Sequence, residues 1–184
     1  RHSRRLVRLR AAGDDGEVSR AKILYQGHAG THQDHLGNRG RTEAGDVQVM
    51  SAGTGIMHAE FNREDEPTQI FQIWIEPAVH GVPPRWETRS FPKAGREGVL
   101  VPLASGRKTD EGALPIHQDA AILGATLKAG QSVIHQLAPG RKAYLVAATG
   151  RLTVNGKPVQ ARDGVALDDV EAIEIVAEED AEIL

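Results

Sequence analysis

Residues 45–62 read GDVQVMSAGTGIMHAEFN, and this stretch decides the fold class. It opens on a Gly-Asp turn signal and continues with the short β-rich run Val47–Met50. The glycine-rich turn Ser51–Gly55 follows, and then a second short run that carries His58 and Glu60. Two short runs joined by a glycine-rich turn are typical of antiparallel β structure.

The same pattern continues outward along the chain, where short β-rich runs bounded by turn residues recur roughly every ten residues. The further runs are Ile23–Gln26, Ile70–Ile75, Val99–Leu103, Ala120–Leu127, Val133–Leu137, Ala143–Ala148, Leu152–Val154, Val165–Leu167 and Ala172–Val176. Asn155-Gly156 predicts a type I′ hairpin, whose two central residues need positive φ. No long stretch keeps a helical period, so the sequence predicts an all-β fold with few, short helices.

The middle of the chain predicts a break between two β modules. Pro77, Pro83, Pro84 and Pro92 cluster there, and proline cannot donate a hydrogen bond into a sheet. We therefore interpret residues 77–97 as a linker. A loose internal repeat supports two modules, because residues 38–49 and 155–167 both read as turn, strand, turn, strand. Short antiparallel strands without helices favour a jelly-roll sandwich or barrel.

The composition excludes several classes of protein. The 184 residues contain 40% hydrophobic and 26% charged residues, as in ordinary globular chains, and no cysteine. Disulfide scaffolds, cysteine-type zinc sites and thiol catalysis are thereby excluded, and a reducing, cytoplasmic location is expected. The net charge of −3 gives no reason to expect nucleic acid as a direct partner. The five arginines among the first ten residues are unlike a secretory signal, and no apolar run is long enough to cross a membrane.

The pair His58 and Glu60 is the best candidate for chemistry. Side chains at positions i and i+2 of a strand point to the same face, so this imidazole and this carboxylate can converge on one cation. Imidazole plus carboxylate without thiolate suits Fe(II), Mn, Ni, Cu or Zn. The pair on its own also matches a surface pair or a packed histidine. His32 and His35 are further candidate ligands by residue type alone.

Residues 31–62 resemble the pirin family of the cupin superfamily. The resemblance rests on Thr31–Asn38, Gly45–Asn62 and Phe71–Ile75, and it continues more loosely through Gly98–Leu103 and Pro115–Asp119 to the C-terminal end. It implies two tandem cupin β-barrels in one chain. The N-terminal cupin, residues 1–90, would bear the metal, and the C-terminal cupin, residues 91–184, would have none.

The resemblance also implies the site residues. Pirin-like proteins hold iron or another divalent metal with three histidines and one glutamate. His58 and Glu60 match the third and fourth of these ligands, and Glu60 would also act as the catalytic general base. We expect Fe(II) as the cofactor. His32 matches a family position that is not a ligand.

The sequence departs from the family at the first two ligands. They form a His-x-His pair upstream of Gly27, at positions near Gly13 and Asp15, and neither residue is histidine. Three explanations stay open. The site is half empty and the protein non-catalytic, or nearby acidic residues (Asp14, Asp15 or Glu17) substitute as oxygen ligands, or the sequence lacks a segment that carries the pair.

Two functions follow from the resemblance. The first is a metal-dependent dioxygenase that acts on flavonols or related aromatic enols such as quercetin. The second is a non-catalytic regulatory protein that binds a protein partner, and a metal-free ligand-binding cupin has only generic support. Neither reading involves direct nucleic acid or membrane binding. Of the remaining residues, we expect Trp74 and Met57 to pack in the protein interior, and His117 and His135 to be structural or at the surface.

Overall fold

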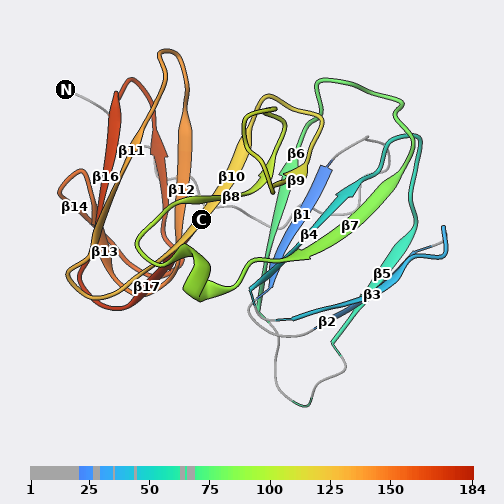
Figure 1. The fold of residues 1–184 in the computed structure, drawn as a ribbon, viewed down its shortest axis with the longest axis horizontal. Helices are drawn as coiled ribbons and strands as arrows, with labels where there is room; N and C mark the ends of the chain where they lie inside the picture. The colour runs from blue at the N-terminus through green and yellow to red at the C-terminus, as the bar shows by residue number, and fades with distance from the viewer. Residues whose placement is uncertain (1–20, 27–29, 35, 44, 63–64, 66–68) are drawn as a thin grey trace. The chain divides into compact units, whose positions relative to one another are not determined.

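The computed structural model describes residues 21–26, 30–34, 36–43, 45–62, 65 and 69–184, with the backbone alone for residues 21–26 and 30 (Figure 1). Every regular element of these residues is a β-strand except the short 3-10 helix η1 (Lys93–Arg96). The predicted all-β class is therefore confirmed. No helix in the described ranges has the length and apolar character that a membrane span requires.

The chain folds into two compact units. Of the described residues, the N-terminal unit takes those up to Pro92 together with Pro102–Ile122, and the C-terminal unit takes Lys93–Val101 and Leu123–Leu184. The two units thus alternate along the chain. The domain boundary expected between residues 90 and 91 stays a prediction.

The first sheet of the N-terminal unit is antiparallel and has the strand order β6-β1-β4-β7. Its strands are β6 (Ile70–Ile75), β1 (Ala21–Gln26), β4 (Asp46–Ser51) and β7 (Arg85–Ser90). Strand β7 lies inside the predicted linker, so that interpretation was wrong for these residues. The prolines flank the strand and do not interrupt it, and β7 therefore keeps the backbone donors that pair it with β4.

The second sheet of this unit has the order β3-β2-β5. Strands β3 (Arg39–Thr42), β2 (Gly30–Asp34) and β5 (His58–Phe61) lie side by side in Figure 1. His32 pairs with Glu60 on one side and with Gly40 on the other, while Asp34 pairs with His58. Directly opposed residues of antiparallel strands share a face of the sheet. The register therefore gathers two histidines and two carboxylates on one face.

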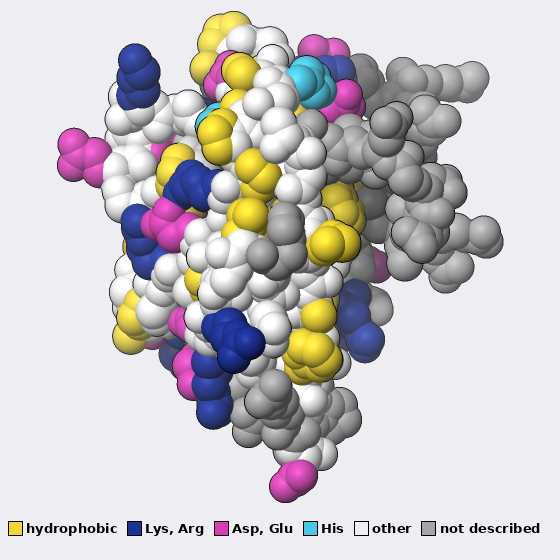
Figure 2. All heavy atoms as spheres, turned by 90° about the vertical axis from the view of Figure 1, so that its right-hand side faces the viewer, with side chains coloured by type: hydrophobic (Ala, Val, Ile, Leu, Met, Phe, Trp, Pro, Cys, Tyr) yellow, Lys and Arg dark blue, Asp and Glu magenta, His cyan; other side chains and the backbone are white. Residues whose placement is uncertain are grey.

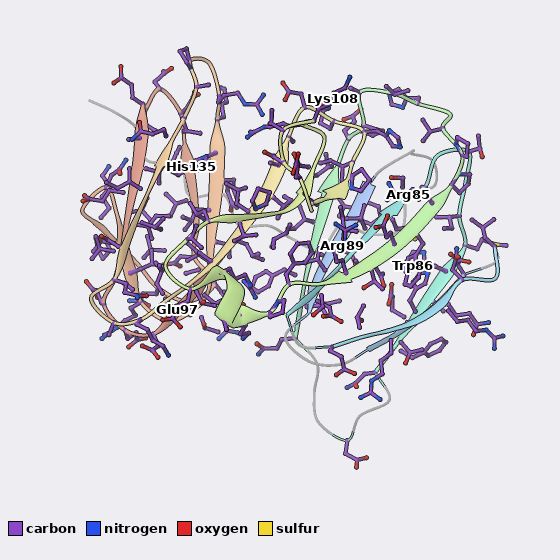
Figure 3. All side chains as sticks on the ribbon, in the orientation of Figure 1. Arg85, Trp86, Arg89, Glu97, Lys108 and His135 are labelled. Carbon is purple, nitrogen blue, oxygen red and sulfur yellow. The ribbon has the colours of Figure 1, made fainter. Side chains whose placement is uncertain are left out.

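A parallel pair of short strands completes the N-terminal unit, formed by β8 (Val101–Ser105) and β9 (Leu114–Pro115). Two arginines of β7 fasten the following segment to the first sheet. Arg85 donates to the carbonyl of Pro115, and Arg89 donates to the carbonyl of Gly112. Figure 3 labels both arginines along β7.

The C-terminal unit consists of two further groups of hydrogen-bonded strands. One has the order β15-β12-β17-β10 and the other β11-β16-β13-β14. Their bounds are β10 (Ala121–Leu127), β11 (Ser132–Gln136), β12 (Ala143–Thr149), β13 (Leu152–Val154), β14 (Lys157–Val159), β15 (Gly164–Leu167), β16 (Ala172–Ala177) and β17 (Ala181–Ile183). Leu127, Leu152, Ile175 and Ile183 are among the buried residues of its core. Asn155 and Gly156 both have positive φ (48° and 72°) between β13 and β14, which confirms the predicted hairpin.

A buried ionic cluster lies beside this core. The Arg96 side chain is 1% exposed, and its Nη2 donates to Oε1 of Glu182 at 2.7 Å. Lys93 Nζ donates to Oε2 of the same carboxylate at 2.9 Å. Burial raises the pKa of Glu182 to about 7, so a charged carboxylate at this position depends on the two cations near neutral pH.

Candidate metal centre

The candidate centre lies on the inner face of β5, which turns toward the first sheet. His58 and Glu60 are half-buried, whereas Ala59 and Phe61, on the alternate face, are exposed. A hydrogen bond joins this face to the first sheet, because Gln48 Nε2 on β4 donates to Glu60 Oε1 at 2.7 Å. The pair found from its i, i+2 spacing therefore shares one inward-facing side of a strand.

The Glu60 carboxylate is held from two strands at once. Besides the Gln48 amide, the Nδ1 nitrogen of His32 on β2 lies 3.0 Å from the same Oε1 atom. His32 reaches it because the two residues are direct cross-strand partners. Two donors on one oxygen, arriving from different sheets, fix the orientation of the carboxylate.

His32 is enclosed on every side. Its side chain is fully buried, and its ring stacks on Trp86 of β7 with the ring centroids 4.7 Å apart and on His58 at 5.8 Å. Its Nε2 nitrogen lies 3.4 Å from Oδ2 of Asp34. Gly40 stands opposite His32 on β3, and a Cβ atom there would overlap the Trp86 ring. Both ring nitrogens of His32 thus face carboxylates.

Asp34 serves the turn between β2 and β3. Its Oδ1 accepts the backbone N–H groups of Leu36 (2.9 Å) and Asn38 (3.0 Å), and its Oδ2 accepts the Asn38 side-chain amide (2.8 Å). Burial alone would raise the pKa of Asp34, but the hydrogen bonds from Asn38, His32 and Leu36 together hold it below its ordinary value. Its oxygens are committed to the turn.

We expect Asp34→Ala to lower the free energy of unfolding by about 2 kcal/mol, because each buried donor that loses its acceptor costs roughly 1–3 kcal/mol. Asp34→Asn keeps one acceptor oxygen and should cost less. Because the folded-state pKa is lowered, the contribution of Asp34 is present above the ordinary pKa of 3.8 and is lost as the pH falls through the folded-state value. Urea unfolding at pH 7 and near pH 3 measures both effects. An equal loss for Asp34→Ala at the two pH values would contradict the assignment.

Two packing predictions were wrong. Met57 is 72% exposed and Trp74 is 48% exposed. In the register of the first sheet, residue 22 pairs with both Trp74 and Met50, and Met50 lies two residues from Gln48 on β4. Trp74 therefore lies on the same face of the sheet as Gln48. Its strand, β6, is at the edge of the sheet, and the side chain remains accessible there. Figure 2, which views the molecule from the right-hand side of Figure 1, shows hydrophobic side chains among charged ones at the surface.

The remaining candidates fall in different places. His35, Asp14, Asp15 and Glu17, together with Gly13, lie outside the described residues. Gln48 and Trp86, of which Figure 3 labels Trp86, were not among the site residues predicted from the sequence. The signal for Gln48 was available, since a glutamine between two valines in a β-rich run marks a polar group on a strand that is otherwise apolar.

The donor types fit a divalent transition metal, but their number does not reach a complete set. His58 and Glu60 supply the imidazole and carboxylate that such metals accept. One further buried oxygen, Oε1 of Gln48, has no hydrogen-bond partner among the described residues. Within the described ranges, however, no group of three or more His, Cys, Asp or Glu side chains is arranged to hold a metal ion.

Comparison with known proteins identifies the two parts of the chain. Residues 17–75 match the family model described as "Pirin", and residues 103–184 match the "Quercetinase C-terminal cupin domain". A pirin-like protein of Caulobacter vibrioides is 56% identical over 154 residues, which are 84% of this chain and 66% of that protein. A quercetin 2,3-dioxygenase of Escherichia coli is 39% identical over 155 residues, 83% of this chain and 65% of that protein. The chain thus spans slightly less than two thirds of these relatives.

The solved structures agree with the fold. The crystal structure of YhhW from Escherichia coli matches with a TM-score of 0.83 and 33% identity over 90% of this chain and 70% of that one. A second structure, of the bacterial pirin YhhW in complex with nickel(II), matches with a TM-score of 0.82 and 34% identity at the same coverage. With both cupin models matched and the strand architecture shared, the chain belongs to the pirin family and is an all-β bicupin.

Proposed function

We propose that this chain is a metal-binding pirin that acts as a dioxygenase on a flavonol such as quercetin, with His58 and Glu60 as metal ligands. The observation that carries the proposal is the inward-facing pair on β5, in which Glu60 is oriented by Gln48 and His32. The Escherichia coli relative named quercetin 2,3-dioxygenase supports the substrate class. The nickel(II) complex of YhhW supports a divalent metal, for which we propose Fe(II) in this chain.

The residues of the chain have distinct roles in this proposal. A divalent metal bound here would lower the pKa of the flavonol hydroxyl and bring it next to dioxygen. Glu60 accepts the proton of that hydroxyl as general base, while Gln48 and His32 hold the carboxylate in place. The fully buried ring of His32, which contacts Glu60, stacks in turn on the half-buried Trp86.

Metal analysis and oxygen uptake test this function directly. The wild-type protein is expected to bind a stoichiometric divalent metal and to consume oxygen with quercetin. His58→Ala should weaken metal binding by more than about 100-fold, because loss of an outer-shell partner alone costs roughly 10–100-fold. Glu60→Gln should abolish turnover, since the amide cannot accept the proton. The exposed His80 provides the matched control, and His80→Ala should change neither property. Wild-type protein without stoichiometric metal would contradict the proposal.

The alternative is a non-catalytic regulatory protein that binds a protein partner. It is favoured by the small number of donors among the described residues, where His58 and Glu60 are only half of the family's ligand set. Metal binding without oxygen uptake in the presence of quercetin would support this alternative, and turnover that disappears in Glu60→Gln would support the enzyme. The cytoplasmic location stays a prediction.

A further inference from the structure

We propose that His32 and Gln48 are positioning residues, which hold the Glu60 carboxylate in the orientation that binds a divalent metal. This inference rests on the metal-binding role of Glu60 proposed above. Neither residue is itself placed as a ligand. Each acts through the carboxylate, His32 from the neighbouring strand of the same sheet and Gln48 from the opposite sheet.

The geometry of His32 argues for this indirect role. Nδ1 is 3.0 Å from Glu60 and Nε2 is 3.4 Å from Asp34, so neither ring nitrogen faces an open position. The ring is fully buried and lies against Trp86 with only 8° between the two planes. To coordinate a cation, His32 would have to leave both carboxylates and the Trp86 stack.

Gln48 shows the same specialisation. Gln48 is 1% exposed, and burying a side-chain amide costs free energy unless the amide is hydrogen-bonded. Its Nε2 donates to Glu60 at 2.7 Å. A carboxylate only accepts hydrogen bonds, so the amide nitrogen must face Glu60 and the amide orientation is fixed. A valine or methionine would suit the apolar surroundings of β4 better, and the contact with Glu60 accounts for the glutamine.

The surrounding packing keeps His32 aimed at Glu60. Trp86 is accommodated only because Gly40 lacks a Cβ atom, and His32 is paired with this glycine. Asp34, which faces the other ring nitrogen, is fixed in turn by Leu36 and Asn38. The Glu60 carboxylate is therefore oriented by contacts within the protein that do not require a bound metal. Pre-organised outer-shell contacts of this kind raise metal affinity.

The test compares three variants with the wild type and uses two metal probes, Ni(II) for affinity and Co(II) for ligand geometry. In His32→Asn the side-chain amide nitrogen can occupy the place of Nδ1 and still donate to Glu60, whereas His32→Leu has no donor. Gln48→Met keeps the volume of the side chain and removes its donor. Titration calorimetry gives the dissociation constant for Ni(II), and the visible absorption of bound Co(II) reports the ligand geometry.

We expect His32→Leu and Gln48→Met each to weaken Ni(II) binding by about 10–100-fold and to change the Co(II) spectrum. His32→Asn should stay within a few-fold of the wild type, a rescue that a purely structural role would not give, since asparagine also loses the stack on Trp86. If His32→Leu does not fold, Gln48→Met and His32→Asn decide. Unchanged affinity and spectrum in the donor-free variants overturn the positioning role and leave the metal-binding function standing. Failure of the wild type to bind Ni(II) overturns both.

Discussion

Replacing Glu182 by leucine is expected to lower the free energy of unfolding by about 3–5 kcal/mol, because removal of one partner from a buried ion pair leaves an uncompensated charge. Glu182 is 6% exposed and accepts from Arg96 and Lys93. The Lys93 side chain is half-exposed and can turn to water, but the guanidinium of Arg96 is 1% exposed and cannot. The penalty therefore falls mainly on Arg96. Urea unfolding of the two proteins measures it.

Two further variants separate charge from packing. The double variant Arg96→Met/Glu182→Leu removes both buried charges and should recover most of the loss, since apolar replacement of a whole pair is often neutral or stabilising. Asp180→Ala removes the ion pair between Lys128 and Asp180, whose side chains are 60% and 65% exposed, and should lower the free energy of unfolding far less than Glu182→Leu does. A double variant as unstable as Glu182→Leu would show that shape, not charge, matters at this position.

The strands and turns that depend on local sequence patterns were predicted correctly. The run Ile70–Ile75 coincides with β6, and Leu152–Val154 coincides with β13, because β-branched and apolar residues bounded by turns need little tertiary help to be recognised. The Asn155-Gly156 turn was predictable for the same reason, since its positive φ angles are a property of two adjacent residues. The i, i+2 spacing likewise places His58 and Glu60 on one face.

The contacts between strands that are far apart in the sequence could not be predicted from it. His32 meets Glu60 through a strand register that joins residues 28 positions apart, and no local pattern encodes that register. Strand β7 was hidden by its flanking prolines, and with it Trp86, whose ring covers His32. Trp74 was misjudged because a strand pattern shows which residues share a face but not which end of that face another element covers.

The turn between β4 and β5 gives the second large effect, which we expect from Gly53→Ala. Gly53 has φ +53°, and a Cβ atom there would overlap the backbone carbonyl of Val82, which also accepts the N–H of Thr54 at 3.1 Å. The left-handed conformation costs a non-glycine residue about 1–2 kcal/mol, and forced overpacking adds roughly 1–3 kcal/mol. We therefore expect a loss of about 3 kcal/mol in the free energy of unfolding, measured by urea denaturation.

Gly37→Ala is the matched control, because Gly37 also has positive φ (+91°) but no atom lies within 4 Å of its added Cβ. The difference between the two variants isolates the overlap with Val82. The turn also joins the strand that carries Gln48 to the strand that carries Glu60, so a displaced Gly53 should separate that donor from its carboxylate. Gly53→Ala should then weaken Ni(II) binding while Gly37→Ala does not. Equal losses of stability in the two variants would mean that backbone strain, and not contact with Val82, sets the need for glycine at position 53.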